Sequence, residues 1–398
     1  MLASVEKCTG CMACLNSCPN GCISSVMDKE GFFQPVIDTE RCLDCRKCEN
    51  ACPIIQGTLK KTREDPDVYA AWNKDEKILK QSSSGGIFGV FAQYILSKQG
   101  VIFGAAYCDG LEVCHIAIEK LDNLHKLQGS KYVQSNIGES YRHVKKALVE
   151  NRYVLFTGTP CQIAGLYAFL EGDKFENLLT CDLVCHGVPS PGVFKSYINY
   201  LEIKEMAKIT GIEMRTKKRG WSSVFDMRYI YDNSKEIEIK NAFKDAYMNG
   251  FLNNIYLRKS CYNCKYAKIP RESDITLGDF WGIGNDIPFN HPTKQGVSLV
   301  LVNSEKGKKL FEQCKENMFF EKRTLEEAKK GNVMLSQRKY ENPYREQFFM
   351  DYQKKSFEEL ISLYLNRRQS CKYAMINGII KVIGRKNIKK IKKLLGRA

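Results

Sequence analysis

The sequence lacks any long apolar run. No stretch of about 18 consecutive apolar residues occurs in its 398 residues, which argues against a membrane-spanning helix. A cleaved signal peptide is not expected either, because patterned cysteines begin at Cys8, within the segment that would be removed. We therefore expect a cytoplasmic protein, with length for two or three domains and ample cores.

Nucleic-acid-binding signatures are also missing: we find no zinc-finger spacing, RNP-like stretch or basic–aromatic platform. The net charge of +16 is concentrated near the C-terminal end, where residues 367–398 contain eleven Lys or Arg and no Asp or Glu. Without that segment the net charge falls to +5. The basic composition therefore predicts no nucleic-acid partner.

Two nucleotide-binding signatures are absent as well. Residues 154–165 read as strand, glycine turn and helix, but they lack both the Gly-Lys-Ser/Thr ending of a Walker loop and a G-x-G-x-x-G fingerprint. Exposed backbone N–H groups at such a helix start suit an anion. An ordinary connecting loop is an equally good interpretation, and the same holds for residues 84–86.

Cysteine, by contrast, is abundant. The chain has eighteen cysteines, and nine of them precede residue 53. A disulfide scaffold suits short exported chains, whereas this density in a long chain without an export signal indicates ligands for metal or clusters.

The N-terminal cysteines form two C-x2-C-x2-C-x3-C-P runs, beginning at Cys8 and Cys42. In this bacterial two-cluster pattern the fourth cysteine of each run binds the cluster of the other run. Zinc more often takes its four ligands in two pairs. Cys22 lies outside the pattern and is expected to be a small buried residue. We assign one [4Fe–4S] cluster to Cys8, Cys11, Cys14 and Cys52, and the other to Cys18, Cys42, Cys45 and Cys48.

The remaining chain alternates strand-like and helix-like segments. A polar linker is expected at residues 60–66, and the alternation beyond it indicates a mixed α/β domain. Strands are expected at 32–37, 68–72, 101–106, 113–118 and 153–156, and helices at 87–96 and 141–150.

Six further stretches follow one another along the chain, at residues 83–86, 129–135, 158–165, 182–191, 261–264 and 274–282. In sequence and in order, these stretches resemble the coenzyme F420 hydrogenase/dehydrogenase beta-subunit family in its bacterial form with a fused ferredoxin. The resemblance covers about residues 1–305. It implies an FAD-binding oxidoreductase with iron–sulfur clusters that carry electrons.

The expected fold class is therefore α+β. A two-cluster ferredoxin domain (1–60) precedes a mixed α/β flavin-binding domain, which is divided into an N-terminal part (61–150) and a C-terminal, cysteine-rich part (151–330). A helical, basic tail (331–398) follows.

The resemblance also implies which residues would bind FAD. Three lie near the flavin phosphates, four line the flavin, and two contact it through backbone. A lysine beside the ring would stabilise its anionic reduced form. No catalytic residue is assigned. The three sets are Ser84, Gly85 and Gly86; Lys131, Tyr132, Gln134 and Ser135; and Gly158 and Thr159.

A third [4Fe–4S] cluster is expected in the flavin domain. Cys261 and Cys264 form a chelating pair, and Cys185 belongs to a matched stretch. Cys161 is the preferred fourth ligand, with Cys181 as its rival. A structural zinc site and an unliganded redox pair stay open for the C-x2-C pair. His186 could bind zinc, but local hydrogen bonding is the more usual role of such a histidine.

The predicted function is electron transfer between ferredoxin-type clusters and FAD, from a redox partner protein to an unidentified acceptor. That acceptor could be coenzyme F420-like, another small molecule or a polysaccharide-pathway substrate. The alternative is a non-catalytic subunit that only transfers electrons to or from a partner enzyme. Residues 215–221 form a basic, Trp-ending cluster that would face an anionic substrate, a ferredoxin partner or solvent.

The basic tail has its own two interpretations. Isoleucines and leucines recur at helical spacing over residues 376–395, with lysines between them. Such a cationic amphipathic helix either lies on the inner face of the membrane or packs on the protein body.

Overall fold

The computed structural model describes residues 2–57, 63–171 and 175–366. The basic tail, residues 367–398, lies outside the described residues, and so do residues 60–62 of the expected linker. Within the described ranges, no helix combines the length and the apolar character needed to cross a membrane.

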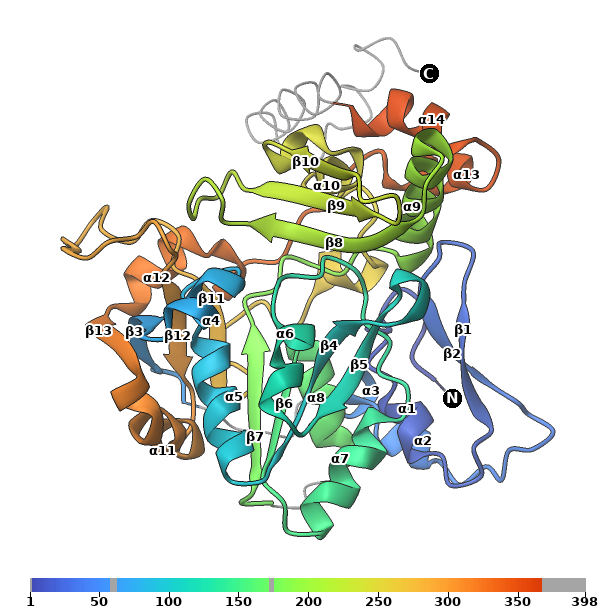
Figure 1. The fold of residues 1–398 in the computed structure, drawn as a ribbon. Coiled ribbons are helices and arrows are strands. Elements are labelled where there is room, and N and C mark those ends of the chain that lie inside the picture. The colour runs from blue at the N-terminus through green and yellow to red at the C-terminus, as the bar shows by residue number, and fades with distance from the viewer. Residues whose placement is uncertain (1, 58–62, 172–174, 367–398) are drawn as a thin grey trace, which may run out of the picture.

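An N-terminal module packs against the side of the molecule (Figure 1). Its two strands form an antiparallel hairpin, and three short helices surround the cysteine runs. The second strand confirms the expectation for residues 32–37. The elements are α1 (Ala13–Ser17), β1 (Ile23–Met27), β2 (Phe33–Ile37), α2 (Lys47–Asn50) and α3 (Pro53–Gln56).

An eight-stranded mixed sheet forms the centre, in the order β13-β3-β12-β11-β7-β6-β4-β5. Its middle strands β11, β7, β6 and β4 run parallel, and antiparallel strands complete both sides. All the strands expected between residues 68 and 156 are confirmed. The bounds are β3 (Asp67–Asn73), β4 (Val101–Tyr107), β5 (Val113–Ile118), β6 (Val154–Gly158), β7 (Leu178–Leu183), β11 (Ile275–Asp279), β12 (Ser298–Val302) and β13 (Met318–Arg323).

Helices cover both faces of this sheet. One face packs on α5, α6 and α11, and the other on α7, α8 and the N-terminal module. The helices expected at 87–96 and 141–150 are confirmed. The bounds are α4 (Glu76–Gln81), α5 (Ile87–Ser97), α6 (Leu124–Leu127), α7 (Ser140–Val149), α8 (Pro160–Phe169), α11 (Glu305–Cys314) and α12 (Leu325–Gly331).

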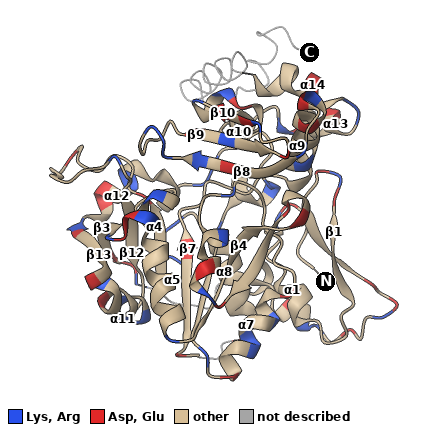
Figure 2. Cartoon of the chain, viewed as in Figure 1, with Lys and Arg blue, Asp and Glu red and all other residues tan. Residues whose placement is uncertain are grey.

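A second layer lies over one end of the sheet (Figure 1). Three antiparallel strands in the order β10-β9-β8 pack with four helices around an aromatic-rich core, which also takes in Phe32 of the N-terminal module. Acidic and basic residues are interspersed over the elements seen in Figure 2. The bounds are α9 (Pro191–Glu205), β8 (Ile209–Thr216), β9 (Asp226–Tyr231), β10 (Glu236–Ile239), α10 (Ala246–Leu252), α13 (Arg345–Tyr352) and α14 (Phe357–Leu360).

Candidate functional site

The first group of thiols combines both N-terminal runs. Cys11 and Cys14 are buried around the start of α1. Burial, together with the neighbouring thiols of Cys8 and Cys52, raises the pKa of the Cys11 thiol to about 12. Burial is also the main cause of the raised pKa of Cys14, and the neighbouring thiols of Cys11, Cys8 and Cys52 contribute to it. Cys52 of the second run therefore joins the first three cysteines, as in the crossed two-cluster pattern.

The second group lines a small cavity at the outer edge of the module, formed by Cys18, Cys42, Cys45 and Cys48 with Cys22. Cys42 and Cys45 are exposed, and the backbone N–H of Asp44 points at the Cys42 sulfur at 3.4 Å. N–H groups directed at sulfur are one of the features that tune iron–sulfur clusters.

Cys22 is buried, as expected, at 5% exposure. Its sulfur lies 3.3 Å from that of Cys18. This fifth thiol thus contacts a predicted cluster ligand, which its spacing in the sequence did not indicate.

A third group forms where α8, the segment after β7 and the turn at Lys259–Asn263 meet. It contains Cys161, Cys185, Cys261 and Cys264. Burial, together with the neighbouring thiols of Cys261 and Cys264, raises the pKa of Cys185 to about 12. Burial, together with the thiols of Cys161 and Cys264, likewise raises the pKa of Cys261 to about 12.

Backbone and hydroxyl groups point at these sulfurs. The N–H of Val188 donates to Cys261 at 3.3 Å, and the N–H of Tyr266 donates to Cys264 at 3.4 Å. The hydroxyl of Thr159 lies 3.1 Å from the Cys161 sulfur. Such polarised contacts suit anionic thiolates.

Cys181 lies apart from this group. Its side chain is buried in β7 within the core that packs on α5 and α11. Burial raises the pKa of its thiol, and the neighbouring charges are the carboxylates of Asp182 and Asp274 rather than thiolates. The geometry thus places Cys161, and not its rival, beside the C-x2-C pair.

Among the residues that the structure describes, no three His, Cys, Asp or Glu side chains converge closely enough to hold a single metal ion. A [4Fe–4S] cluster spreads its four thiolates over four iron atoms, so its ligands lie farther apart. His186 makes a local hydrogen bond to Asn254 Oδ1 at 3.0 Å, and burial lowers its pKa to about 3.

A cavity of about 490 Å³ opens between the carboxyl ends of the parallel strands and the three-stranded layer. Cys161 and Cys185 contribute to its wall. Eight of the nine residues proposed for FAD line it: Ser84, Gly86, Lys131, Tyr132, Gln134, Ser135, Gly158 and Thr159.

Gly85, the ninth residue, packs against the sheet instead. A Cβ atom there would lie 2.6 Å from Ser298 N and closer still to Ala71 O. Only glycine therefore allows the loop before α5 to lie on β3 and β12, which positions the residues on either side of it.

The strand–turn–helix motif at 154–165 forms β6 and α8, as expected. Thr159 and Gln162 make a capping box, in which the Thr159 N–H donates to Gln162 Oε1 at 2.9 Å, and Pro160 occupies the first helical position. This local sequence fixes the helix start, and with it the position of Cys161.

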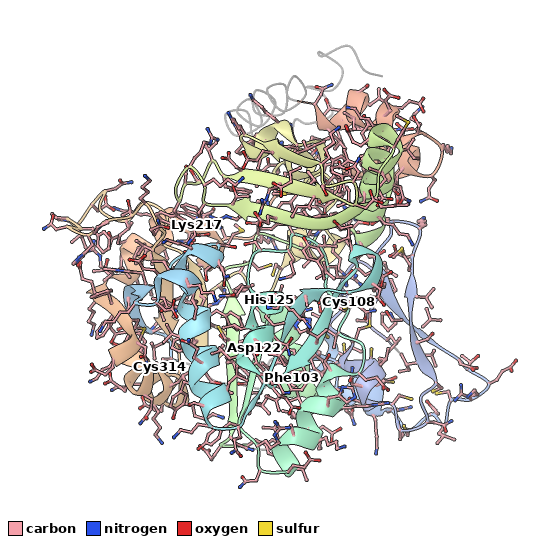
Figure 3. The ribbon with its side chains drawn as sticks, viewed as in Figure 1. Phe103, Cys108, Asp122, His125, Lys217 and Cys314 are labelled. Atoms are coloured by element: carbon pink, nitrogen blue, oxygen red, sulfur yellow. A yellow bond between two sulfur atoms is a disulfide. The ribbon has the colours of Figure 1, made fainter. Side chains whose placement is uncertain are left out.

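One lysine lines the cavity, and a second contacts a residue of the cavity wall. Burial lowers the pKa of Lys131 to about 8, and its Nζ donates to Gln128 O at 2.9 Å. Burial also lowers the pKa of Lys217 to about 8. Lys217 lies where the two sheets meet (Figure 3), and its Nζ donates to Ser84 O at 2.9 Å.

The basic cluster at 215–221 is divided between cavity and surface. Arg215 lines the cavity and pairs with Asp279, which also accepts a hydrogen bond from the Trp221 indole at 2.6 Å. Lys218 pairs instead with Glu238 at 2.6 Å on the surface. Residue spacing alone could not separate the two sides of this cluster.

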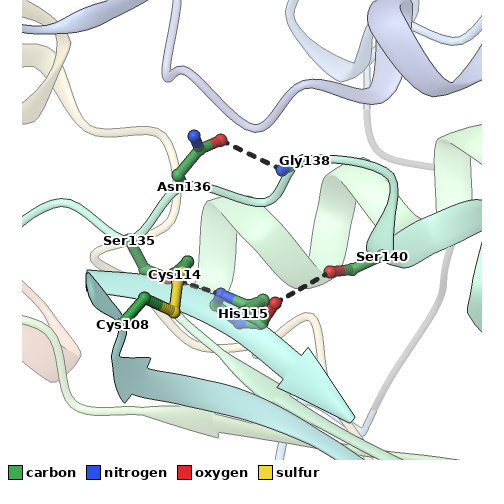
Figure 4. Close-up of a disulfide and its surroundings, with 7 residues drawn as sticks. All are labelled: Cys108, Cys114, His115, Ser135, Asn136, Gly138 and Ser140. Carbon is green, nitrogen blue, oxygen red and sulfur yellow. Dashed lines mark hydrogen bonds between the residues drawn. A yellow bond between two sulfur atoms is a disulfide. The ribbon is translucent and has the colours of Figure 1, made fainter. Parts of the chain in front are cut away.

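His115 is a cavity residue that no sequence pattern indicated. Its Nδ1 lies 2.6 Å from Ser135 Oγ (Figure 4). Its Nε2 lies 2.9 Å from Thr157 O. Burial lowers the pKa of His115 to about 4, so the ring is neutral at pH 7. Because Thr157 O can only accept, Nε2 carries the proton and Ser135 donates to Nδ1.

Next to His115, a disulfide joins Cys108 and Cys114 across the connection from β4 to β5 (Figure 4). Neither cysteine belongs to a motif from which a role could be predicted. The bridge closes a loop of the strand pair that carries His115, and it lies outside the three thiol groups.

Two family models match the chain. Residues 7–54 match the 4Fe-4S dicluster domain, and residues 151–328 match the family described as the C terminus of the coenzyme F420 hydrogenase/dehydrogenase beta subunit. The chain is thus an iron–sulfur protein of the electron-transfer class. Residues 151–328 belong to the coenzyme F420 hydrogenase/dehydrogenase beta-subunit family, and an N-terminal ferredoxin-type domain precedes them.

No curated protein matches the sequence. Among solved structures, a chain of the F420-reducing [NiFe] hydrogenase complex from Methanosarcina barkeri, studied as a xenon derivative, is 18% identical with a TM-score of 0.47. The match covers 76% of this chain and 95% of that chain.

Proposed function

We propose that the chain is an FAD-dependent oxidoreductase that carries electrons through three [4Fe–4S] clusters to a flavin in the cavity. The observation that carries the proposal is that Cys161 both lines the cavity and belongs to the third thiol group. One turn further along α8, Gly165 lies directly against Cys11 of the N-terminal module. A single helix thus links the module to the cavity.

The burial of the thiols suggests a direction along this path. Cys42 and Cys45 are exposed, whereas Cys11 and Cys14 are buried against the body of the protein. A redox partner protein would therefore exchange electrons at the outer cluster. The inner cluster and the Cys161 group would relay them to the flavin.

FAD, when bound, exchanges single electrons with clusters and electron pairs with an organic acceptor. The chain supplies the anion-binding groups: backbone N–H groups at the start of α5, beside Ser84 and Gly86, suit the diphosphate. The partly buried ammonium of Lys131 would offset negative charge on the reduced ring. The acceptor is coenzyme F420-like, another small molecule or a polysaccharide-pathway substrate.

An anaerobic preparation of the full chain, analysed for flavin, iron and acid-labile sulfide, tests the proposal. We expect bound FAD, about twelve iron atoms per chain, and turnover of an artificial electron acceptor. Clusters without flavin, or without turnover, would favour the non-catalytic wiring role. A protein that stays colourless in the flavin region after reconstitution with FAD would contradict the flavin assignment.

FAD affinity is expected to fall between pH 7 and pH 9. Because the pKa of Lys131 is lowered to about 8, its ammonium is mostly present at pH 7 and mostly lost at pH 9. An anionic ligand favours the charged form, so one such lysine accounts for a loss of up to about tenfold per pH unit above its pKa. Equilibrium dialysis of FAD at constant ionic strength measures the change.

Lys131→Met is the matched variant for this pH dependence. It should bind FAD more weakly at pH 7 and lose part of the pH dependence, with Lys217, whose pKa is also about 8, supplying the rest. Equal FAD affinity of the unmodified protein at both pH values would contradict the role given to these lysines.

A further inference from the structure

Arg258 is buried at the junction between the N-terminal module and the cavity. Its side chain is 1% exposed. Its Nε donates to Cys8 O at 2.8 Å, its Nη1 to Phe33 O at 3.0 Å and its Nη2 to Gln34 Oε1 at 2.5 Å. Its remaining polar contact is Gln134 Oε1, 3.4 Å from Nη1. All four partners are neutral.

Other buried arginines of the molecule have carboxylate partners. Arg215 pairs with Asp279, Arg323 with Glu327 and Arg345 with Glu30. In the described ranges no carboxylate pairs with Arg258. A guanidinium does not lose its proton in proteins, and an isolated buried charge is strongly unfavourable. The buried guanidinium of Arg258 therefore needs a nearby anion, and among the described residues no acidic side chain provides it.

Two of the thiol groups lie beside this cation. The Arg258 side chain holds the carbonyl of Cys8, which belongs to the inner group of the N-terminal module. Its backbone carbonyl accepts the N–H of Cys261, at 2.9 Å, in the third group. A [4Fe–4S] cluster with four thiolate ligands is an anion, and one-electron reduction adds a further negative charge. Arg258 thus lies where cluster charge would develop.

We propose that Arg258 is the charge-compensating residue of the inner cluster, held by Cys8, Cys11, Cys14 and Cys52, and that it raises the reduction potential of that cluster. The inference rests on the proposed cluster assignment. The cation favours the form with one more electron, which a reduced one-electron carrier supplies, and no proton moves. Net charge and hydrogen bonding around a cluster are established determinants of its potential.

The test is an EPR-monitored redox titration of the full chain, with dithionite as reductant, after iron and sulfide have been counted. In Arg258→Gln the midpoint potential of one cluster should fall by at least about 59 mV. For a one-electron couple, this shift corresponds to an about tenfold lower ratio of reduced to oxidised cluster at a given applied potential. Arg258→Lys keeps the charge and should stay close to the unmodified protein.

A second variant neutralises the charge without removing the arginine. Gln134→Glu places an isosteric carboxylate beside the guanidinium and should lower the same midpoint. Arg345→Gln is the matched control, because Arg345 is also buried and also contacts the N-terminal hairpin, but it is paired with Glu30. In this variant the midpoint potential of the inner cluster should not change.

Two results would overturn the role of Arg258 alone: unchanged midpoints in both Arg258→Gln and Gln134→Glu, or a shift in Arg258→Lys as large as in Arg258→Gln. The second result would mean that guanidinium hydrogen bonding, and not charge, sets the potential. An unmodified protein with no iron or sulfide would instead overturn the cluster assignment on which the inference rests.

Discussion

Replacing Cys185 with alanine should lower the iron content of anaerobically prepared protein from about twelve atoms per chain to about eight. The reason is that Cys185 is surrounded by thiols: those of Cys261 and Cys264 both raise its pKa. A [4Fe–4S] cluster that loses one of four protein ligands is labile, whereas the two clusters of the N-terminal module use other cysteines. Iron and acid-labile sulfide analysis measures the change directly.

Cys181→Ala is the matched control. This cysteine precedes Cys185 by four residues and is buried, but its charged neighbours are carboxylates. Its replacement should leave the iron content unchanged. Loss of four iron atoms in Cys181→Ala together with full iron in Cys185→Ala would reverse the ligand assignment.

Replacing Gly165 with alanine should destabilise the protein and slow reduction of the flavin. A Cβ atom at this position would lie 2.8 Å from Cys11 Cβ and 2.9 Å from Cys11 Sγ. Removing a glycine from a helix gains about 0.5–1 kcal/mol, but overpacking a tight contact costs about 1–3 kcal/mol. The net effect is therefore destabilising, and the relief of the clash moves the inner cluster away from α8.

Urea unfolding measures the stability change, and stopped-flow absorbance after mixing with dithionite measures flavin reduction. Gly211→Ala serves as the control, since its Cβ would lie 3.3 Å from the flexible end of Ile230 on the three-stranded sheet. The control should keep the original rate. A Gly165→Ala protein that is more stable and equally fast would show that contact with α8 does not position the inner cluster.

Local patterns predicted much of this structure. The two cysteine runs indicated the dicluster domain, and hydrophobic periodicity placed the strands from residue 68 to 156 together with α5 and α7. These features depend on residues close in sequence, so they can be read from one chain. The capping residues Thr159, Pro160 and Gln162 similarly determine where α8 begins.

The unpredicted features depend on contacts between distant residues. Cys161 and Cys181 could not be separated by spacing, and only the path of β7 and α8 distinguishes them. Arg258 lies 250 residues from Cys8 in sequence, and a single arginine in a basic stretch gives no sign that it is buried. The division of the basic cluster between Arg215 and Lys218 arises in the same way, from the packing of β8 over the sheet.

The N-terminal hairpin is held by two later parts of the chain, the start of α9 and α13. Arg345 pairs with Glu30, Ser190 donates to Glu30 O at 2.6 Å, and the backbone of Gly192 meets that of Gly31 at 3.0 Å. In some multidomain redox enzymes a mobile carrier domain moves on a flexible linker between two docking sites. The contacts of this hairpin instead hold the N-terminal module against the body of the protein. The rate of electron transfer would then depend on fixed distances between the redox centres and on their differences in reduction potential, and not on movement of the module.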